Sequence, residues 1–250
     1  MNERKKGQKE ARIGLDSEKD IVRAINTDRQ FRSSIKECLS TFGFVAREEI
    51  KAYTDGTKTD IFIHNGFRVG VSIKSSTKTS FHSMDRRRLQ NWKKYLNMPD
   101  EIFKILKESI LRIAQNSRNK FILPKDRQRV KDFFVRHLRE IINEIFTKGE
   151  DRLKIFLIND KRRHKIYLFK MDDVINFLLN NARNSVNFSP KGIMHLGDFL
   201  SMQRKSGDGS HITIPKTNWE HPGNHLQFKF SPLKFAEHIE ENRDIKVCIV

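Results

Sequence analysis

Two short apolar runs around an Asn-Gly pair are the feature that most restricts how this chain can fold. The stretch TDGTKTDIFIHNGFRVGVSIKSS has strand-like residues at 60–64 and 67–75, separated by Asn65 and Gly66. Asn-Gly is a strong hairpin signal, because the central residues of a tight two-residue turn need a positive φ. Largely apolar runs are typical of strands inside a sheet rather than at its edge. The stretch therefore predicts an antiparallel hairpin within a larger sheet.

Polar residues stand at the ends of these two runs. Asp60 begins the first run, and Ser72 and Lys74 are two apart in the second, so their side chains share one face. A carboxylate that holds a divalent cation against a phosphate, with an amine beside the attacking water, is the minimum for phosphodiester hydrolysis. The alternative is an ordinary hairpin whose end charges discourage edge-to-edge aggregation.

The hairpin register distinguishes the two interpretations. A strict two-residue turn would pair Asp60 with Val71 and place Asp60 and Ser72 on opposite faces of the sheet. A three-residue loop, or a bulge at one of the nearby glycines, would bring Asp60 opposite Ser72. A nuclease site therefore requires one extra residue in the hairpin.

The charge balance points to a polyanionic partner. The 250 residues contain 49 Lys and Arg against 31 Asp and Glu, which gives a net charge of +18. Nucleic acid is favoured over a membrane surface, because the basic residues are spread through structured segments and form no long basic amphipathic helix with an aromatic face. We expect a nucleic acid as the partner.

The ends of the chain bear on the compartment. The start, MNERKKGQKEARIG, has no apolar stretch behind it, and no run of about 18 apolar residues occurs anywhere, so we expect a soluble protein without a membrane partner. Cys38 and Cys248 lie far apart and lack the spacing of a zinc site. A reducing bacterial cytoplasm is the expected location.

The remaining patterns predict alternating helices and strands. Helical stretches are expected from Asp16 or Ser17 to Gly43 and at 83–96, 100–115, 125–147 and 171–181. Strands are expected at 44–50, in a second hairpin over 153–169 with a basic tip at 161–165, and in the pieces SVNFS, FLSMQRK, HITI and HLQFKF. This order predicts an α/β (α+β) protein with a mixed sheet in a single domain over 1–250.

Several blocks, in the same order over nearly the whole chain, resemble one nuclease family. GTKTDIFI, VSIKSS, SFHSMDRRRLQNW, NFSPKGIMHLG, MQRKSGDG and NHLQFKFSP are similar to the HinP/MspI-like type II restriction endonucleases of the PD-(D/E)XK superfamily, especially the HinP-type enzyme that cuts GCGC. The resemblance implies a restriction-endonuclease-like αβββαβ core with flanking helices over about 14–170, and a β-rich DNA-recognition part over about 185–232.

The resemblance also assigns catalytic and metal-binding roles. Asp60 matches the Mg²⁺-holding Asp, Lys74 the catalytic Lys, and Ile73 the position whose backbone carbonyl contributes to the metal site. Ser72 stands where the superfamily usually has Asp or Glu, and leaves the second metal ligand open. Glu18 matches a helix acid that some members use for a second metal; from the sequence alone it equally fits a solvent-facing charge or a capping box.

Candidate DNA contacts lie in several blocks, each with an ordinary surface role as the alternative. Donors that reach base edges are expected before the Gly-Asp-Gly turn and in the SPKG segment, at Gln203, Arg204, Lys205, Ser189 and Lys191. Arg86, Arg87 and Arg88 would bind phosphates of the double-stranded DNA that the resemblance implies, or form a solvated helix face, as would the 161–165 tip. Ser83 falls at the family's intercalating position, where a serine is too short to wedge between bases.

Other chemistries are disfavoured. Five histidines, His64, His82, His195, His211 and His221, lack metal-ligand spacing and are expected to be structural or DNA-facing. The sequence has neither a GxSxG elbow nor a GxxxxGK[ST] loop, which argues against a serine hydrolase and a P-loop ATPase.

The expected function is a Mg²⁺-dependent type II restriction endonuclease that cuts a short GC-rich palindrome, GCGC as first guess, and leaves 5′-phosphates. A companion DNA methyltransferase is expected in the cell, and monomer or homodimer stays open. The alternatives are a repair or junction nuclease of the superfamily and a DNA-binding protein that has lost catalysis.

Overall fold

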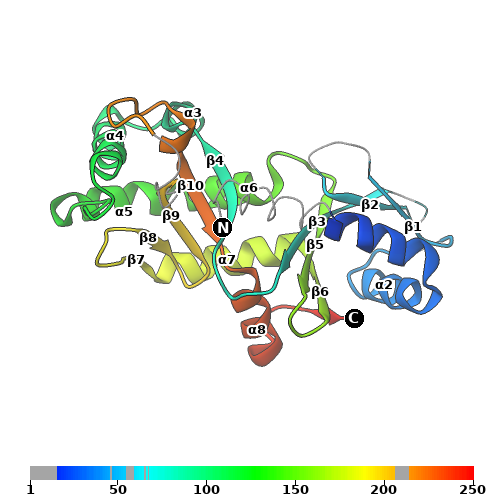
Figure 1. Ribbon diagram of the computed structural model, residues 1–250. Helices are drawn as coiled ribbons and strands as arrows, with labels where there is room; N and C mark the ends of the chain where they lie inside the picture. Colours follow the sequence, from blue (N-terminus) through cyan, green and yellow to red (C-terminus); the bar gives the residue numbers. More distant parts are fainter. Residues whose placement is uncertain (1–15, 46, 55–58, 65, 67, 206–213) are drawn as a thin grey trace. The chain divides into compact units, whose positions relative to one another are not determined.

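The described residues form two compact units. The computed structural model of the protein describes residues 16–45, 47–54, 59–64, 66, 68–205 and 214–250. The first unit comprises the chain up to Ser80, Thr147–Phe177 and Pro232–Val250, and the second comprises Phe81–Phe146 and Leu178–Ser231. Each unit contains one sheet (Figure 1). The catalytic core is predicted over about 14–170, but residues 81–146 of that range belong to the second unit.

The sheet of the first unit is mixed, as predicted. Its strand order is β1 (Lys51–Tyr53), β2 (Ile61–His64), β3 (Arg68–Ser76), β5 (Leu153–Asp160), β6 (Lys165–Lys170) and β11 (Cys248–Ile249). β3 and β5 run parallel, and the other neighbours are antiparallel. The predicted second hairpin is confirmed as β5 and β6, and the expected strand at 44–50 is replaced by β1.

The β2–β3 hairpin has the register that a shared site requires. The paired residues are Ile61 with Val71, Phe62 with Gly70, Ile63 with Val69 and His64 with Arg68. Three residues, 65–67, therefore separate the last pair, and continuing the register outward aligns Asp60 with Ser72. The strict two-residue turn is wrong. Gly66 has a φ of +96°, a left-handed conformation that glycine adopts without a side-chain penalty.

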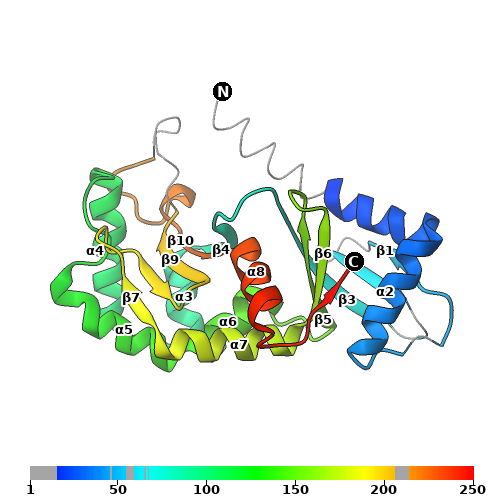
Figure 2. The ribbon, with the colours of Figure 1, turned by 90° about the horizontal axis from the view of Figure 1, so that it is seen from below.

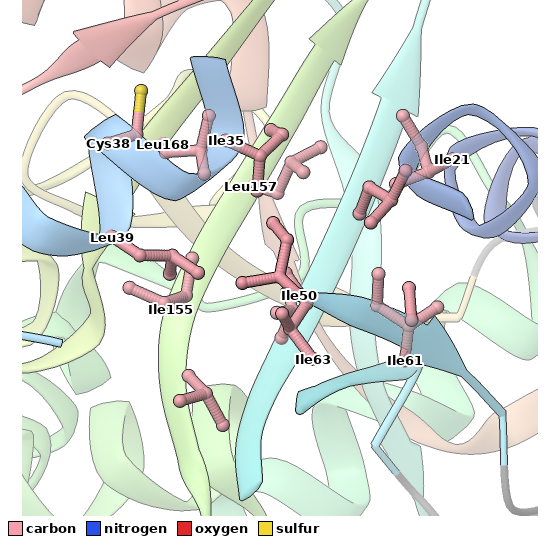
Figure 3. Close-up of a cluster of buried hydrophobic side chains, with 14 of the residues drawn as sticks. Ile21, Ile35, Cys38, Leu39, Ile50, Ile61, Ile63, Ile155, Leu157 and Leu168 are labelled. Atoms are coloured by element: carbon pink, nitrogen blue, oxygen red, sulfur yellow. The ribbon is translucent and has the colours of Figure 1, made fainter. Parts of the chain in front are cut away.

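Helices cover both faces of this sheet. A helix over 16–27 and α2 (Arg29–Thr41) meet at Asp28, whose side chain accepts a hydrogen bond from the Phe31 N–H as an N-cap. Their apolar residues pack on alternate residues of β2, β3 and β5, as Figure 3 shows for Ile21 and Leu39 over the strands. The two helices form a layer on this face of the sheet, and the apolar side chains between helices and sheet are buried.

The opposite face of the sheet packs against α8 (Pro232–Asn242), which in turn contacts α7 (Met171–Asn184). Phe169 of β6 packs edge-on against Phe235 of α8, with 5.2 Å between ring centroids. Phe177 of α7 lies 5.7 Å from the same Phe235 ring. The first unit is therefore a sheet between two helical layers, the α/β arrangement predicted for the core.

The second unit has a five-stranded antiparallel sheet. Its strand order is β4 (His82–Arg87), β10 (Leu226–Phe230), β9 (Leu200–Arg204), β8 (Met194–Leu196) and β7 (Val186–Phe188). The helices of this part of the chain are α3 (Leu89–Tyr95), α4 (Asp100–Gln115), α5 (Arg127–Arg136) and α6 (Leu138–Thr147). Short 3₁₀ turns occupy Pro124–Asp126 and Pro222–Asn224. The helix at 100–115 is confirmed, and the one at 125–147 is divided near His137.

The predicted helix at 83–96 is wrong in its first half. Residues 82–87 form β4, which pairs with β10, and α3 begins only at Leu89. The apolar stripe is real, because Met84 and Trp92 are both buried. Pairing with a strand some 140 positions away overrides the local helical period, since strand formation depends on tertiary partners. β8, α8 and β11 were not predicted, and most of the HITI piece lies outside the described residues.

A disulfide joins Cys38 and Cys248, the two cysteines for which a reducing compartment was expected. Cys38 of α2 and Cys248 of β11 are bonded, with 5.5 Å between their Cα atoms and a sequence separation of 210 residues. β11 lies beside β6 and carries the end of the chain to α2 (Figure 2). This pairing differs from the reduced thiols that a cytoplasmic location predicts. No helix of the described residues is long and apolar enough to cross a membrane.

We predict that reducing this disulfide destabilises the first unit. Breaking a cross-link between residues 210 apart enlarges the entropy of the unfolded chain, so the free energy of unfolding should fall by about 2–4 kcal/mol. Urea unfolding with and without a phosphine reductant measures the change. Cys38→Ser is the control, because its stability should not respond to reductant. Two free thiols in the air-oxidised protein would contradict the prediction.

Candidate functional site

The carboxylate of Asp60 is the centre of a hydrogen-bonded group on the first sheet. Asp60 directly precedes β2, and its Oδ2 accepts hydrogen bonds from the Ile73 N–H at 2.6 Å and the Ser72 hydroxyl at 3.1 Å. The Nζ of Lys74 lies 3.9 Å from the same oxygen. These contacts follow from the register, because alignment of Asp60 with Ser72 brings the carboxylate alongside β3.

Lys74 is held by both charge and backbone. Its Nζ donates a hydrogen bond to the Ile73 carbonyl at 3.1 Å, close to the Asp60 carboxylate. The side chains of Lys74 and Asp60 are 25% and 23% exposed, so both can meet a bound substrate. Ser72 is buried at 8% exposure, which suits a supporting hydrogen bond rather than direct contact with substrate.

Glu18, from the helix over 16–27, belongs to the same electrostatic environment. Burial raises the pKa of the Glu18 carboxyl, the negative charge of Asp60 raises it further, and Lys74 lowers it. A divalent cation would offset the repulsion between neighbouring carboxylates. The structure thus brings Glu18, Asp60, Ser72, Ile73 and Lys74 into one electrostatic environment.

The donor set fits Mg²⁺ only as a sparse site. Among the described residues, no group of three or more His, Cys, Asp or Glu side chains could hold a metal ion. The oxygens on hand are the carboxylates of Asp60 and Glu18 and the carbonyl of Ile73. Mg²⁺ prefers such hard oxygen ligands and commonly keeps several waters, so one or two carboxylates with a carbonyl suffice.

A second set of polar side chains lies on one face of the five-stranded sheet. β10 alternates, with Leu226, Phe228 and Phe230 fully buried and Gln227 and Lys229 between them. The register aligns these two polar positions with residues of both neighbouring strands. The resulting polar rows are Arg86, Gln227 and Gln203, and then Ser83, Lys229, Ser201, His195 and Asn187.

This polar face includes four of the predicted DNA-binding residues. Ser83, Arg86 and Gln203 stand in the two rows, and Lys205 follows Gln203 at a spacing of two, on the same side. The Nε of Arg86 donates to the Ser83 hydroxyl at 2.8 Å, which agrees with a shared face. Ser83 and Arg86 therefore project from a strand, β4, and not from the helix that was predicted.

The other two predicted arginines point to the opposite, packed face. Arg87 donates to both Asp85 oxygens, at 2.8 and 2.5 Å, and lies 2.8 Å from Glu144, with its guanidinium over the Trp92 ring. Arg204 is buried, and its Nε donates to Asn224 Oδ1 at 2.8 Å.

Arg87 and Arg204 thus have their hydrogen-bond and ion-pair partners within the second unit. The geometry favours Ser83, Arg86, Gln203 and Lys205 as the members of the predicted set that face a ligand.

The remaining predicted residues occupy turns. Ser189 accepts a hydrogen bond from the Ile193 N–H in the β7–β8 turn, and Lys191 is exposed in the same turn. The basic tip of the second hairpin is held within the first unit, where Arg163 pairs with Glu240 and Arg162 with Glu237. Residues 162–164 of the tip are exposed, as expected for a solvated surface, and these ion pairs offset part of its positive charge.

The five histidines that the sequence singled out lie in different surroundings. His64 is 4.0 Å from Glu48, His221 accepts from the Gly223 N–H, and His82 and His195 lie on the second sheet. His211 is outside the described residues.

Sequence reasoning missed Ser201, Gln227 and Lys229 on the polar face. A signal existed in LQFKF, where apolar and polar residues alternate strictly, but only the register shows which neighbours they join.

The fold is that of a restriction-endonuclease-like protein. A solved structure of restriction endonuclease MspI in complex with its cognate DNA matches the chain with a TM-score of 0.57 and 18% sequence identity. The match covers 92% of this chain and 93% of that one. No family model and no curated protein matches the sequence. The likeness shows the fold, and the mixed central sheet predicted from the sequence is confirmed with it.

We predict that the charge of Asp60 raises the pKa of Glu18 in the metal-free protein. The pKa of Glu18 should exceed its ordinary value of 4.5, and Asp60→Asn should lower it without restoring 4.5, because burial is the larger cause. Since the folded-state pKa is raised, the free energy of unfolding should decrease as pH rises from the unfolded pKa through the folded one. Carbon-detected NMR of the carboxyl groups measures the pKa of Glu18 in the wild type and in Asp60→Asn.

Asp20→Asn, an exposed change on the same helix, is the matched control and should leave the Glu18 pKa in place. A Glu18 pKa that ignores Asp60→Asn would contradict the proximity of the two carboxylates.

Proposed function

We propose that the protein is a Mg²⁺-dependent type II restriction endonuclease that cleaves both strands of DNA at a short GC-rich palindrome, with GCGC as the first sequence to test. The observation that carries this proposal is the hairpin register, which holds Asp60 against Ser72, Ile73 and Lys74. The fold likeness to an endonuclease described with its cognate DNA and the net charge of +18 support it.

Asp60 and the Ile73 carbonyl would hold Mg²⁺, with Glu18 as a further ligand. The ion, when bound, supplies positive charge to the scissile phosphate. The hydrogen bonds to Asp60 from Ser72 and Ile73 fix the carboxylate before substrate arrives, which lowers the reorganisation needed during reaction.

Lys74 has the chemistry to act at the phosphate. Its ammonium, anchored by the Ile73 carbonyl, would orient the attacking water and stabilise the negative charge that builds on the phosphorane oxygens. Ser72 supplies a hydrogen bond where the superfamily usually supplies a second carboxylate. The chain would therefore bind the ion with fewer protein charges and more water.

The polar face of the second sheet would contact the DNA. The amide side chain of Gln203 can read base edges, and Arg86, Lys205 and Lys229 can neutralise phosphates. A repair or junction nuclease of the same superfamily would use the same site. Ser72 is the observation that favours the other alternative, a DNA-binding protein without catalysis.

We predict that purified protein cuts unmethylated plasmid into discrete bands with Mg²⁺, and not with EDTA. Asp60→Ala and Lys74→Ala should each lower the rate by at least about 10²–10³-fold, because each removes a preorganised charge at the phosphate. Gel analysis with time points gives the rates, and sequencing of the ends gives the site and the 5′-phosphate.

Asp151→Ala and Lys154→Ala, exposed changes in the same unit, are matched controls that should keep wild-type rates. A smear, or cutting only at branches, supports the repair or junction nuclease. Binding without cutting by the wild type supports the inactive DNA-binding protein.

A further inference from the structure

Three basic residues stand side by side at one end of the second sheet. Leu226 of β10 pairs with Arg87 on one side and Arg204 on the other. Arg88 and His225 lie one residue beyond β4 and β10 and both have extended backbone angles, so continuing the register aligns Arg88, His225 and Lys205. The Lys205 N–H donates to the His225 carbonyl at 2.7 Å, as that alignment requires. We refer to Arg88, His225 and Lys205 as the cation row.

The cation row lies on the polar face. Its members precede or follow the row of Arg86, Gln227 and Gln203 at a spacing of two along each strand, so their side chains lie on the same side. The pKa of Lys205 is lowered by burial and also by the charge of Arg86, which agrees with that placement. Arg88 is exposed. The row therefore borders the surface proposed to meet DNA.

His225 is the unusual member of the row. Its Nε2 is buried and has no hydrogen-bond partner among the described residues. Burial lowers the pKa of His225, and Lys205, Arg88 and His221 lower it further, while Asp85 alone raises it. Asp85 is itself paired with Arg87. The imidazole is thus kept neutral among cations, with one ring nitrogen left unsatisfied.

We propose that Arg88, His225 and Lys205 bind one phosphate of the DNA backbone, and that His225 takes up a proton from solvent when this phosphate arrives. The inference rests on the proposed DNA-binding function. A phosphodiester brings one negative charge and acceptor oxygens to a place where Arg88 and Lys205 supply positive charge. The protonated imidazole then donates from its second nitrogen to the phosphate, which satisfies the buried Nε2.

Proton uptake makes the affinity for DNA depend on pH in a stated direction. Between the His225 pKa of the free protein and the higher pKa of the complex, the dissociation constant should increase with pH, by up to about tenfold per pH unit. Above both pKa values the dependence ends, because the proton is then absent from both states. A permanently neutral, purely structural histidine predicts no such slope.

The direct test is an NMR titration of the histidine ring signals in the wild-type protein without Mg²⁺. The probe is a short DNA duplex containing one GCGC, and His225→Gln identifies the His225 signal by its loss. The pKa of His225 should rise by about one unit or more when the duplex is added. An unchanged His225 pKa in the complex would overturn the proposal that the cation row binds a phosphate with proton uptake. It would leave the proposed nuclease function in place.

Binding measurements separate the members of the row. Anisotropy titrations with the same duplex at pH values from about 5 to 8 should show the slope in the wild type and in His238→Gln, a paired histidine of α8 that serves as the control. His225→Gln should lose the slope and match the wild type at the highest pH. Lys205→Gln should reduce the salt dependence of log Kd by about one ion at every pH.

A slope that survives in His225→Gln would overturn the inference. No binding to any duplex would overturn the proposed function as well, so the two failures are distinguishable.

Discussion

The one-residue offset in the β2–β3 hairpin is the constraint on which the proposed site depends. Strand side chains alternate between faces, so a shift of a single residue would exchange every inward and outward position. Ile61, Ile63 and Val71 are buried at 1% exposure or less, and their burial fixes the register. The same packing therefore decides that Asp60 meets Ser72 and Lys74. The geometry of the proposed site is a consequence of the core packing.

Gly70 links this hairpin to the rest of the sheet. A Cβ at this position would lie 2.6 Å from the Arg152 carbonyl, whose oxygen instead accepts a hydrogen bond from the Gly70 N–H at 2.9 Å. That close approach starts the parallel pairing of β3 with β5, which continues past Ser72 and Lys74. β3 is thus held on both sides, by β2 and by β5, along the segment that carries the site residues. A rigid central strand is a suitable place for groups that must be preorganised.

The second sheet has one packed, largely apolar face and one face that carries the polar rows. On β10 apolar and polar residues alternate, although the polar Gln227 is itself buried, and the neighbouring strands continue the polar rows. The β-bulge between Phe228 and Lys229 restores the alignment of Ser83 with the polar side after Met84 turns inward. A protein of charge +18 can thus gather part of its positive charge on one surface, while Arg87 is neutralised by Asp85 and Glu144.

The sequence predicted what depends on local pattern. The hairpin, the need for one extra residue in it and the helix at 100–115 all rest on spacing within a few residues, and the structure agrees with them. What failed depends on distant partners. β4 was read as a helix because its strand partner, β10, lies far along the chain.

The predictions for the two cysteines and for the orientation of two arginines failed for the same reason. The bond between Cys38 and Cys248 spans 210 residues, and no local signal predicts it. The inward orientation of Arg87 and Arg204 follows from register, which composition does not specify.

Manganese titration by NMR tests the central claim, that the Asp60 register creates a divalent-cation site. Mn²⁺ broadens the signals of nearby nuclei, so small additions should first remove the backbone amide signals of Asp60, Ile73 and Lys74. Asp60→Asn should abolish this selective loss while the rest of the spectrum stays folded. Persistence of these signals while amides elsewhere disappear would contradict the account.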